Sequence, residues 1–176
     1  MEYLILFLPL LASIISGFFG KLIGDRVSQI ITSLFVSISA LLSLVVFYKV
    51  ATVGYENNLI IATWINSGSL NVNWSINIDA LSSVMLVVVT VISSLVHIYS
   101  IGYMSHDPHK SRFMSYLSLF TFAMLTLVTS DNFIQLFFGW EGVGLCSYFL
   151  IGFWFKKPSA NAAAIKAFLV NRVGDF

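Results

Sequence analysis

Residues 80–105 read ALSSVMLVVVTVISSLVHIYSIGYMS and contain no Asp, Glu, Lys or Arg. A helix needs about 20 mostly apolar residues to cross the hydrocarbon core of a bilayer, and this run is long enough. Over the whole chain, 58% of the residues are hydrophobic and 10% are charged, whereas soluble domains carry about 25% charged residues. The composition therefore predicts a membrane protein and excludes an ordinary soluble domain.

Other long apolar runs lie at 3–19, 29–48, 113–130 and 133–155. Together with residues 80–105 they predict five complete transmembrane helices, and a sixth helix begins near Ala160 and is incomplete at Phe176. We interpret the first run as a span and not as a signal peptide, because Glu2 stands where a basic region would precede the apolar segment. The predicted fold class is an all-α polytopic membrane protein.

The basic residues indicate an orientation for these spans. Six of them lie in the connections after the first, third and fifth spans, which fall on one side: Lys21, Arg26, Lys110, Arg112, Lys156 and Lys157. The opposite side holds only Lys49. The positive-inside rule places the six cations in the cytoplasm or its organellar equivalent, and so places the N-terminus on the outer, periplasmic or intermembrane, side.

The long outer connection predicts a short β-hairpin at about residues 60–78. From Leu70 to Ile78 apolar and polar residues alternate, with Leu70, Val72, Trp74, Ile76 and Ile78 on one face and Asn71, Asn73, Ser75 and Asn77 on the other. A period of two is typical of a half-buried strand. Asn66-Ser67-Gly68 is a turn signal, with 63–65 as the partner strand. The alternative is an irregular amphipathic loop.

The stretch GWEGVGLCSYFLIGFW, residues 139–154, places a carboxylate inside the fifth span. At 1.5 Å per residue, Glu141 lies roughly 12 Å into a core about 30 Å thick. A carboxylate at that depth must find a partner or stay protonated, and by default it is a functional-site hypothesis. Glu141 is thus the main candidate for proton transfer. The alternative is a structural hydrogen bond to a neighbouring helix.

Small residues surround this acid. Gly139, Gly142 and Cys146 follow an i, i+3, i+7 spacing on one helical face, which would let another helix approach closely. Glu141 points away from that face. Cys146 is the only cysteine, so no disulfide can form within the chain, and we interpret it as a small buried thiol.

The last segment, NAAAIKAFLVNRVGDF, adds three ionisable residues on the sixth helix. Lys166, Arg172 and Asp175 would lie about 9, 18 and 22 Å into the membrane. Lys166 can extend back to the inner surface. Arg172 and Asp175 are three residues apart and can pair with each other on one face. With Glu141 they suggest a polar layer across the middle of the membrane.

His97, late in the third span, has two readings: a hydrogen bond to a neighbouring helix, or a proton relay. His106, Asp107 and His109 lie in an inner connection, and their spacing is too weak to predict a metal site. The chain has no glycine-rich phosphate loop, CxxC or haem-attachment motif, so we expect no cofactor and no metal bound by it.

Several stretches carry a resemblance to a known family: HIYSIGYM (97–104), RFMSYLSLFTFAML (112–125), DNFIQLFFGWEGVG (131–144), GWEGVGLCSYFLIGFWF (139–155) and KAFLVNRVGDF (166–176). In this order they are similar to the largest antiporter-like subunits of respiratory complex I, the subunit L or subunit 5 family. The resemblance covers essentially the whole chain and is most specific after His97.

The resemblance implies a proton-translocating subunit of NADH:quinone oxidoreductase, built on two inverted five-helix repeats. It implies that Glu141 pairs with a lysine on a seventh helix, that Arg172 and Asp175 lie near the channel, and that Lys166 is a family basic position. Residues 1–112 would hold the first three helices and the hairpin, and 113–176 the start of the first repeat. Because the seventh helix is lacking, we expect an inactive N-terminal fragment in which Glu141 has no partner.

The resemblance also implies an inner membrane, bacterial or mitochondrial, and as partners the bilayer and other membrane subunits, above all the neighbouring antiporter-like subunit. Nucleic acid is not expected. NADH, FMN, iron–sulfur clusters and quinone would belong to the rest of the complex. Two alternatives stay open: a subunit of a multisubunit sodium/proton antiporter, and a purely structural membrane-assembly segment.

Overall fold

The computed structural model describes residues 1–68 and 70–175. Its elements are α1 (Glu2–Ile23), α2 (Asp25–Val53), β1 (Asn57–Ser67), β2 (Leu70–Ile78), α3 (Ala80–Tyr103), α4 (Lys110–Val128), α5 (Phe133–Ile151) and α6 (Pro158–Asp175). Within the described residues, α1 to α5 are long and apolar enough to cross a membrane. The all-α membrane fold with five spans is therefore confirmed, and a sixth helix follows them, although Phe176 lies outside the described residues.

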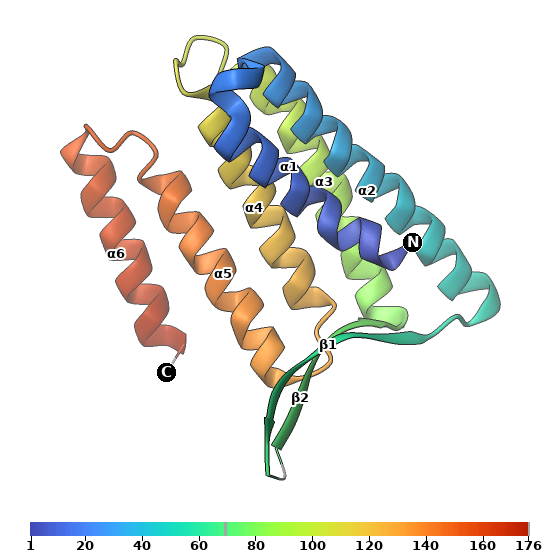
Figure 1. The fold of residues 1–176 in the computed structure, drawn as a ribbon. Helices are drawn as coiled ribbons and strands as arrows, with labels where there is room; N and C mark the ends of the chain where they lie inside the picture. The colour runs from blue at the N-terminus through green and yellow to red at the C-terminus, as the bar shows by residue number, and fades with distance from the viewer. Residues whose placement is uncertain (69, 176) are drawn as a thin grey trace.

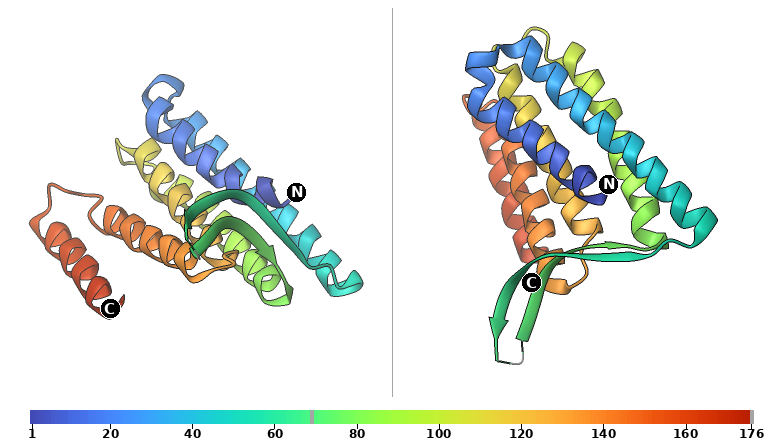
Figure 2. Two further views of the ribbon diagram at one scale, coloured as in Figure 1. Left: turned by 60° about the horizontal axis from the view of Figure 1, so that its bottom comes forward. Right: turned by 45° about the vertical axis from the view of Figure 1, so that its right-hand side comes forward.

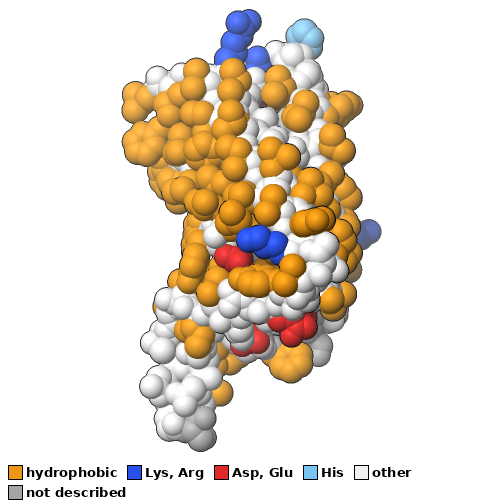
Figure 3. Space-filling model, turned by 90° about the vertical axis from the view of Figure 1, so that its right-hand side faces the viewer, with side chains coloured by type: hydrophobic (Ala, Val, Ile, Leu, Met, Phe, Trp, Pro, Cys, Tyr) orange, Lys and Arg blue, Asp and Glu red, His pale blue; other side chains and the backbone are white. Residues whose placement is uncertain are grey.

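Successive helices run in opposite directions and pack side by side (Figures 1 and 2). Helices α1 to α4 form a bundle, and α5 and α6 extend it as a row beyond α4. The α1–α2, α3–α4 and α5–α6 connections meet at one end, the basic end, which holds the six predicted cations. The other end, the hairpin end, carries β1 and β2. On the face shown in Figure 3, hydrophobic side chains cover the middle, and Lys, Arg and His side chains project at the basic end.

Local signals explain where helices begin and end. Gly24 is the single residue between α1 and α2, and it has a φ of 90°, which glycine adopts without strain. The fifth span is shorter than predicted, because the helix ends at Ile151 and Gly152 caps it. Pro158 then opens α6, two residues before the predicted start, in the first helical turn where its missing N–H does no harm.

Hydroxyl groups connect the helices of the bundle. The Ser115 Oγ donates to the Ser13 carbonyl at 2.8 Å, which joins α4 to α1. Ser43 and Thr90 join α2 to α3, with their hydroxyl oxygens 2.7 Å apart. Such hydrogen bonds matter in lipid because packing one apolar surface on another gains little there. The outward faces carry exposed apolar side chains such as Phe18, 80% exposed.

The small-residue face of α5 packs on α4, as predicted. A Cβ on Gly139 would lie 2.7 Å from the backbone N and Cα of Leu127, and one on Gly142 would lie 3.1 Å from the Cβ of Ala123. Cys146 on the same face is 3% exposed. Helices α4 and α5 are therefore in close contact, and α6 packs on another side of α5.

The hairpin is also confirmed, but it is longer and less regular than predicted. Strand β1 begins at Asn57 and pairs antiparallel with β2. Two register shifts, at 60–62 and 63–65, add one residue each to β1. Such bulges bend a ribbon, and Figure 1 shows the hairpin following the helix ends and then turning away from them. The predicted alternation fails at Ser75, which is fully buried.

Ser75 is buried because α5 clamps its backbone. The Gln135 Oε1 accepts from the Ser75 N–H at 2.9 Å, and the Gln135 Nε2 donates to the Ser75 carbonyl at 2.7 Å. Asn132 caps α5 and also donates to the carbonyl of Asn73 at 2.9 Å. The side chain of Trp74 packs edge-on against Phe138. These contacts fix the start of α5 against the hairpin.

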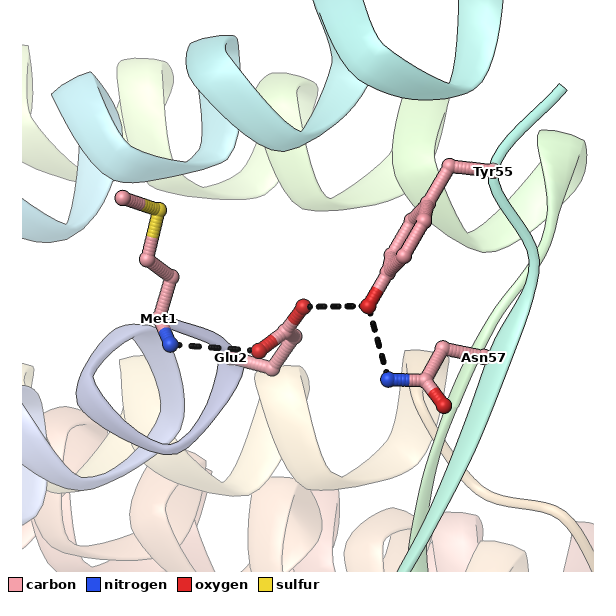
Figure 4. Close-up of polar contacts among 4 residues, drawn as sticks. All are labelled: Met1, Glu2, Tyr55 and Asn57. Atoms are coloured by element: carbon pink, nitrogen blue, oxygen red, sulfur yellow. Dashed lines mark hydrogen bonds and ion pairs between the residues drawn. The ribbon is translucent and has the colours of Figure 1, made fainter. Parts of the chain in front are cut away.

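A second polar cluster ties the N-terminus to the hairpin (Figure 4). The Tyr55 hydroxyl donates to Glu2 Oε1 at 3.0 Å and accepts from Asn57 Nδ2 at 2.7 Å. The N-terminal ammonium of Met1 lies 3.1 Å from Glu2 Oε2. Burial, together with the bond to the Glu2 carboxylate, raises the pKa of Tyr55 above its usual value. The start of α1 is thereby held beside β1.

Replacing Gly139 by alanine should separate α5 from α4, because the new Cβ would meet backbone atoms that cannot turn aside. We expect a loss of about 1–3 kcal/mol, which is typical of overpacking. Thermal denaturation of the full-length protein in detergent measures it. Gly144→Ala is the matched control, since nothing lies within 4 Å of a Cβ there. Equal melting of the two variants would contradict the close α4–α5 contact.

Replacing Gln135 by alanine leaves the buried N–H and carbonyl of Ser75 without partners. Each such group costs about 1–3 kcal/mol, so we expect the hairpin to detach before the bundle melts. Limited proteolysis of the hairpin in the full-length protein reports this detachment. The Asn71→Ala change at an exposed position of β2 serves as the control and should leave cleavage unchanged. If the hairpin of Gln135→Ala resisted cleavage as wild type does, the hydrogen bonds of Gln135 to Ser75 would not be needed to hold it.

Candidate functional site

The acid inside the fifth span has a partner on the next helix. Glu141 on α5 forms an ion pair with Arg172 on α6, between Oε1 and Nη1. The Glu141 side chain is 20% exposed and that of Arg172 is 38% exposed. The guanidinium also lies over the ring of Phe168, 5.0 Å from its centroid. The expectation that Glu141 has no partner in this chain was therefore wrong.

A second contact joins the same two helices directly beside the ion pair. The Trp140 Nε1 donates to Asp175 Oδ1 at 2.6 Å. Two consecutive residues of α5 are thus bound by residues three apart on α6. The predicted local pair between Arg172 and Asp175 was wrong, because the close packing of α6 on α5 offers each of them a partner across the helix interface.

Depth explains why Glu141 and Arg172 meet. The two helices run in opposite directions, so Glu141 lies about 12 Å from the hairpin end of α5 and Arg172 about 21 Å from the basic end of α6. In a core about 30 Å thick these positions are at nearly the same level. The depths predicted from the sequence already placed Glu141 and Arg172 at similar levels in the membrane. Only the adjacency of α5 and α6 brings the two side chains into contact.

A cavity of about 690 Å³ lies next to this pair, between α4, α5 and α6. Its lining includes the polar side chains of Trp140, Ser147, Asn171 and Asp175 among apolar ones. The Asp175 carboxylate and the Asn171 amide on α6, with the Ser147 hydroxyl on α5, can hold water within an otherwise apolar region. The Trp140–Asp175 contact therefore stands between the ion pair and a space that can be wet.

His97 lies elsewhere, in the bundle between α3 and α4. It is fully buried, its Nδ1 is 2.7 Å from the Ser93 carbonyl, and its Nε2 is 3.0 Å from the Ser118 hydroxyl. A carbonyl only accepts, so Nδ1 carries hydrogen and a neutral ring accepts from Ser118 at Nε2. The predicted hydrogen bond to a neighbouring helix is confirmed. The relay role stays a prediction.

The remaining candidates are not gathered at the ion pair. Lys166 is exposed on α6. His106 and His109 are exposed in the α3–α4 connection, where Asp107 accepts from the His109 N–H at 2.8 Å. Among residues 1–68 and 70–175, no group of three His, Cys, Asp or Glu side chains is arranged to hold a metal ion.

The sequence did not predict the positioning roles of two residues. Gln135 reads as one polar residue in an apolar helix, and only its place opposite Ser75 shows its role. Arg112 reads as one of six surface cations, but its Nη2 donates to the Phe153 carbonyl at 3.1 Å and so ties α4 to the end of α5. Neither contact has a local sequence signal.

Two family models match parts of the chain. One, described as NADH-Ubiquinone oxidoreductase (complex I), chain 5 N-terminus, matches residues 64–114, and one described as NADH:quinone oxidoreductase/Mrp antiporter, TM, matches residues 130–176. NADH-ubiquinone oxidoreductase chain 5 of Arabidopsis thaliana is 60% identical over the whole chain, which covers 26% of that relative. NADH-quinone oxidoreductase subunit L of Rickettsia conorii is 56% identical over 98% of the chain, again 26% of the relative.

One solved structure is similar in fold. The membrane-bound sulfane sulfur reductase, an archaeal respiratory membrane complex, contains a chain that superimposes with a TM-score of 0.81 over 98% of this chain and 34% of its own length. Its sequence identity of 18% makes this a likeness of fold alone. The chain spans about a quarter of the length of the curated relatives it matches.

Replacing Arg172 by glutamine removes the cation beside Glu141 but keeps the length and polarity of the side chain. A carboxylate without a nearby cation favours its neutral form in a low-dielectric setting. Hydrophobic carbodiimides modify the neutral carboxyl group, so we expect faster labelling of Glu141 in Arg172→Gln, read by peptide mass spectrometry of the full-length protein. Lys166→Gln on the same helix is the control. Equal labelling in both would mean that Arg172 does not govern Glu141.

Proposed function

Because this chain belongs to the family of NADH-ubiquinone oxidoreductase chain 5 and NADH-quinone oxidoreductase subunit L, we propose that the full protein translocates protons as a membrane subunit of that complex. Quinone reduction elsewhere in the complex drives the step, and this chain does no redox chemistry itself. Glu141 is the protonation site within the part described here.

The observation that carries the proposal is the ion pair of Glu141 with Arg172 between two adjacent membrane helices. A purely structural contact is served by neutral hydrogen bonds, such as those of Ser43 with Thr90. An ion pair away from water is a poor way to gain stability, since desolvation offsets much of the attraction. Its use in the middle of a span therefore supports a group whose charge changes.

The guanidinium of Arg172 has a second possible hydrogen-bond acceptor on its own helix. Asp175 lies three residues later on α6, a spacing at which Arg and Asp can pair. When Glu141 takes a proton, Arg172 can turn to Asp175, and Trp140 then releases that carboxylate toward the cavity. When Arg172 returns, Glu141 loses its proton. The family resemblance adds a lysine on a seventh helix as a further partner that competes for the same acid.

Other residues have subordinate roles in this proposal. Lys166 lies on the side of α6 nearer the basic end and provides a cation between that end and Arg172. His97, neutral and bound to Ser118, is a proton relay only if water reaches the α3–α4 interface. The division of the chain at residue 112 stays a prediction.

The setting follows from the same proposal. The protein lies in a bacterial cytoplasmic or mitochondrial inner membrane, with the N-terminus on the outer side and the basic end inside. Its partners are the other membrane subunits, the neighbouring antiporter-like subunit above all. NADH, FMN, iron–sulfur clusters and quinone are held by other subunits of the complex.

The decisive experiment compares wild type with Glu141→Gln in the full-length protein, assembled in its complex in sealed vesicles. Glutamine keeps the shape and one hydrogen-bond acceptor but cannot take a proton from water at ordinary pH. We expect assembly to be unchanged, while proton uptake through this subunit falls by about a hundredfold or more, the lower end of the range for loss of a proton-transfer group. Proton uptake is followed together with NADH oxidation.

Asp131→Asn is the matched control, because Asp131 is an exposed acid at the hairpin end. Unchanged proton uptake in Glu141→Gln would contradict the proposal and favour the structural-segment alternative. Transport that requires sodium and proceeds without the quinone-reducing subunits would favour the multisubunit antiporter, whose transmembrane domain shares the family model over residues 130–176.

A further inference from the structure

A second cavity lies at the basic end, between α4, α5 and α6. It has a volume of about 220 Å³, well above the roughly 10–15 Å³ that one water molecule needs on this scale. Its lining includes Arg112, Tyr116, Tyr148, Phe153, Phe155 and Asn161. Apart from Arg112 and the small residues Gly152 and Ala164, the lining is aromatic or polar, and it carries no acid. This cavity is separate from the one beside Glu141.

Arg112 is held in place but not neutralised. Its guanidinium lies 4.7 Å from the ring centroid of Phe153 and 5.4 Å from that of Phe155. Its Nη2 donates to the Phe153 carbonyl, while its Nε is buried and has no hydrogen-bond partner. Within residues 1–68 and 70–175 no carboxylate forms an ion pair with it. Arg112 is therefore a positioned cation that lines the cavity and has no ion-pair partner among the described residues.

Asp107, the acid near enough to interact with the charge of Arg112, is already engaged. Its Oδ2 accepts from Trp154 Nε1 at 2.9 Å, and its Oδ1 accepts from the His109 N–H at 2.8 Å. Burial opposes ionisation of this carboxyl group, but these hydrogen bonds hold its pKa below the usual value. Asp107 is thus an ionised acid committed to the α3–α4 connection, and Arg112 keeps its capacity for another anion.

We propose that this cavity binds the phosphodiester headgroup of an anionic glycerophospholipid, with Arg112 as the residue that recognises the phosphate. A planar guanidinium that lies over an aromatic ring keeps its N–H groups at its edge, where they can donate to phosphate oxygens. Tyr116, Tyr148 and Asn161 add hydrogen-bond donors to the lining.

The place of the cavity favours a lipid over a soluble phosphate. It lies where three helices reach one end of their spans, at the level where headgroups meet aromatic side chains. Lys156 and Lys157 are exposed in the adjoining α5–α6 connection, and basic residues just outside a span attract anionic lipid. The apolar faces of α5 and α6 next to the cavity can accept the acyl chains.

The test uses the full-length protein in its complex, in phosphatidylcholine vesicles that contain a photoactivatable phosphatidylglycerol. Peptide mass spectrometry locates the crosslinks. We expect labelling of residues 148–164 by this probe, and at least about fivefold less by a photoactivatable phosphatidylcholine, which is the effect of one cation near an anionic lipid. Arg112→Gln should lower the anionic labelling to the phosphatidylcholine level.

Arg26→Gln is the matched control, because Arg26 is an exposed cation at the same end that does not line the cavity; its labelling should match wild type. The proposal would be overturned if both probes labelled the protein equally, or if Arg112→Gln kept full labelling. It would also be overturned if wild type were not labelled at all, since that would mean that protein fills the cavity. Displacement of the probe by inorganic phosphate would assign the site to free phosphate instead. If Arg112→Gln fails to assemble, a competition experiment on the wild-type protein tests the proposal. Unlabelled phosphatidylglycerol must then displace the photoactivatable probe, and unlabelled phosphatidylcholine must not.

Discussion

The close contact of Gly139 with Leu127 sets the position of the residues that carry charge in this membrane protein. Because Gly139 has no side chain, α5 packs directly on Leu127 of α4, and a Cβ at residue 139 would lie 2.7 Å from the Leu127 backbone. Rotation of α5 would bring a larger side chain into this contact. Trp140 and Glu141 follow at successive steps of about 100° around the helix, so their direction is set by the glycine before them. The face turned away from α4 meets α6, and there Arg172 and Asp175 bind the two residues.

The bundle behind this contact is held by different forces. Ser13, Ser43, Thr90 and Ser115 link α1 to α4 and α2 to α3 through neutral hydrogen bonds, which have no competing water in lipid. His97 belongs to the same kind of contact. The α5–α6 interface instead uses an ion pair. The contacts within the bundle are thus neutral, whereas the α5–α6 interface carries opposite charges.

Helix α5 is fastened at both ends and carries its charge in between. At the hairpin end, Gln135 and Asn132 bind the backbone of β2. At the basic end, Arg112 binds the carbonyl of Phe153, just past the last turn. With its ends held by α4 and the hairpin, α5 offers Glu141 a fixed place opposite Arg172 of α6.

Hydropathy alone was enough to predict the spans, because long apolar runs are stable in a membrane, and the alternation after Leu70 was enough to predict a strand. The i, i+3, i+7 spacing of Gly139, Gly142 and Cys146 likewise predicted the close-packed face, since helical periodicity is local. Only the tertiary structure decided which helix Glu141 faces. Spacing along one helix suggested that Arg172 pairs with Asp175, but an antiparallel neighbour brings residues distant in sequence to the same depth, and the packing of α6 on α5 selected the partner. The burial of Ser75 and the unneutralised Arg112 arose in the same way, from contacts between segments far apart in the chain that no local pattern records.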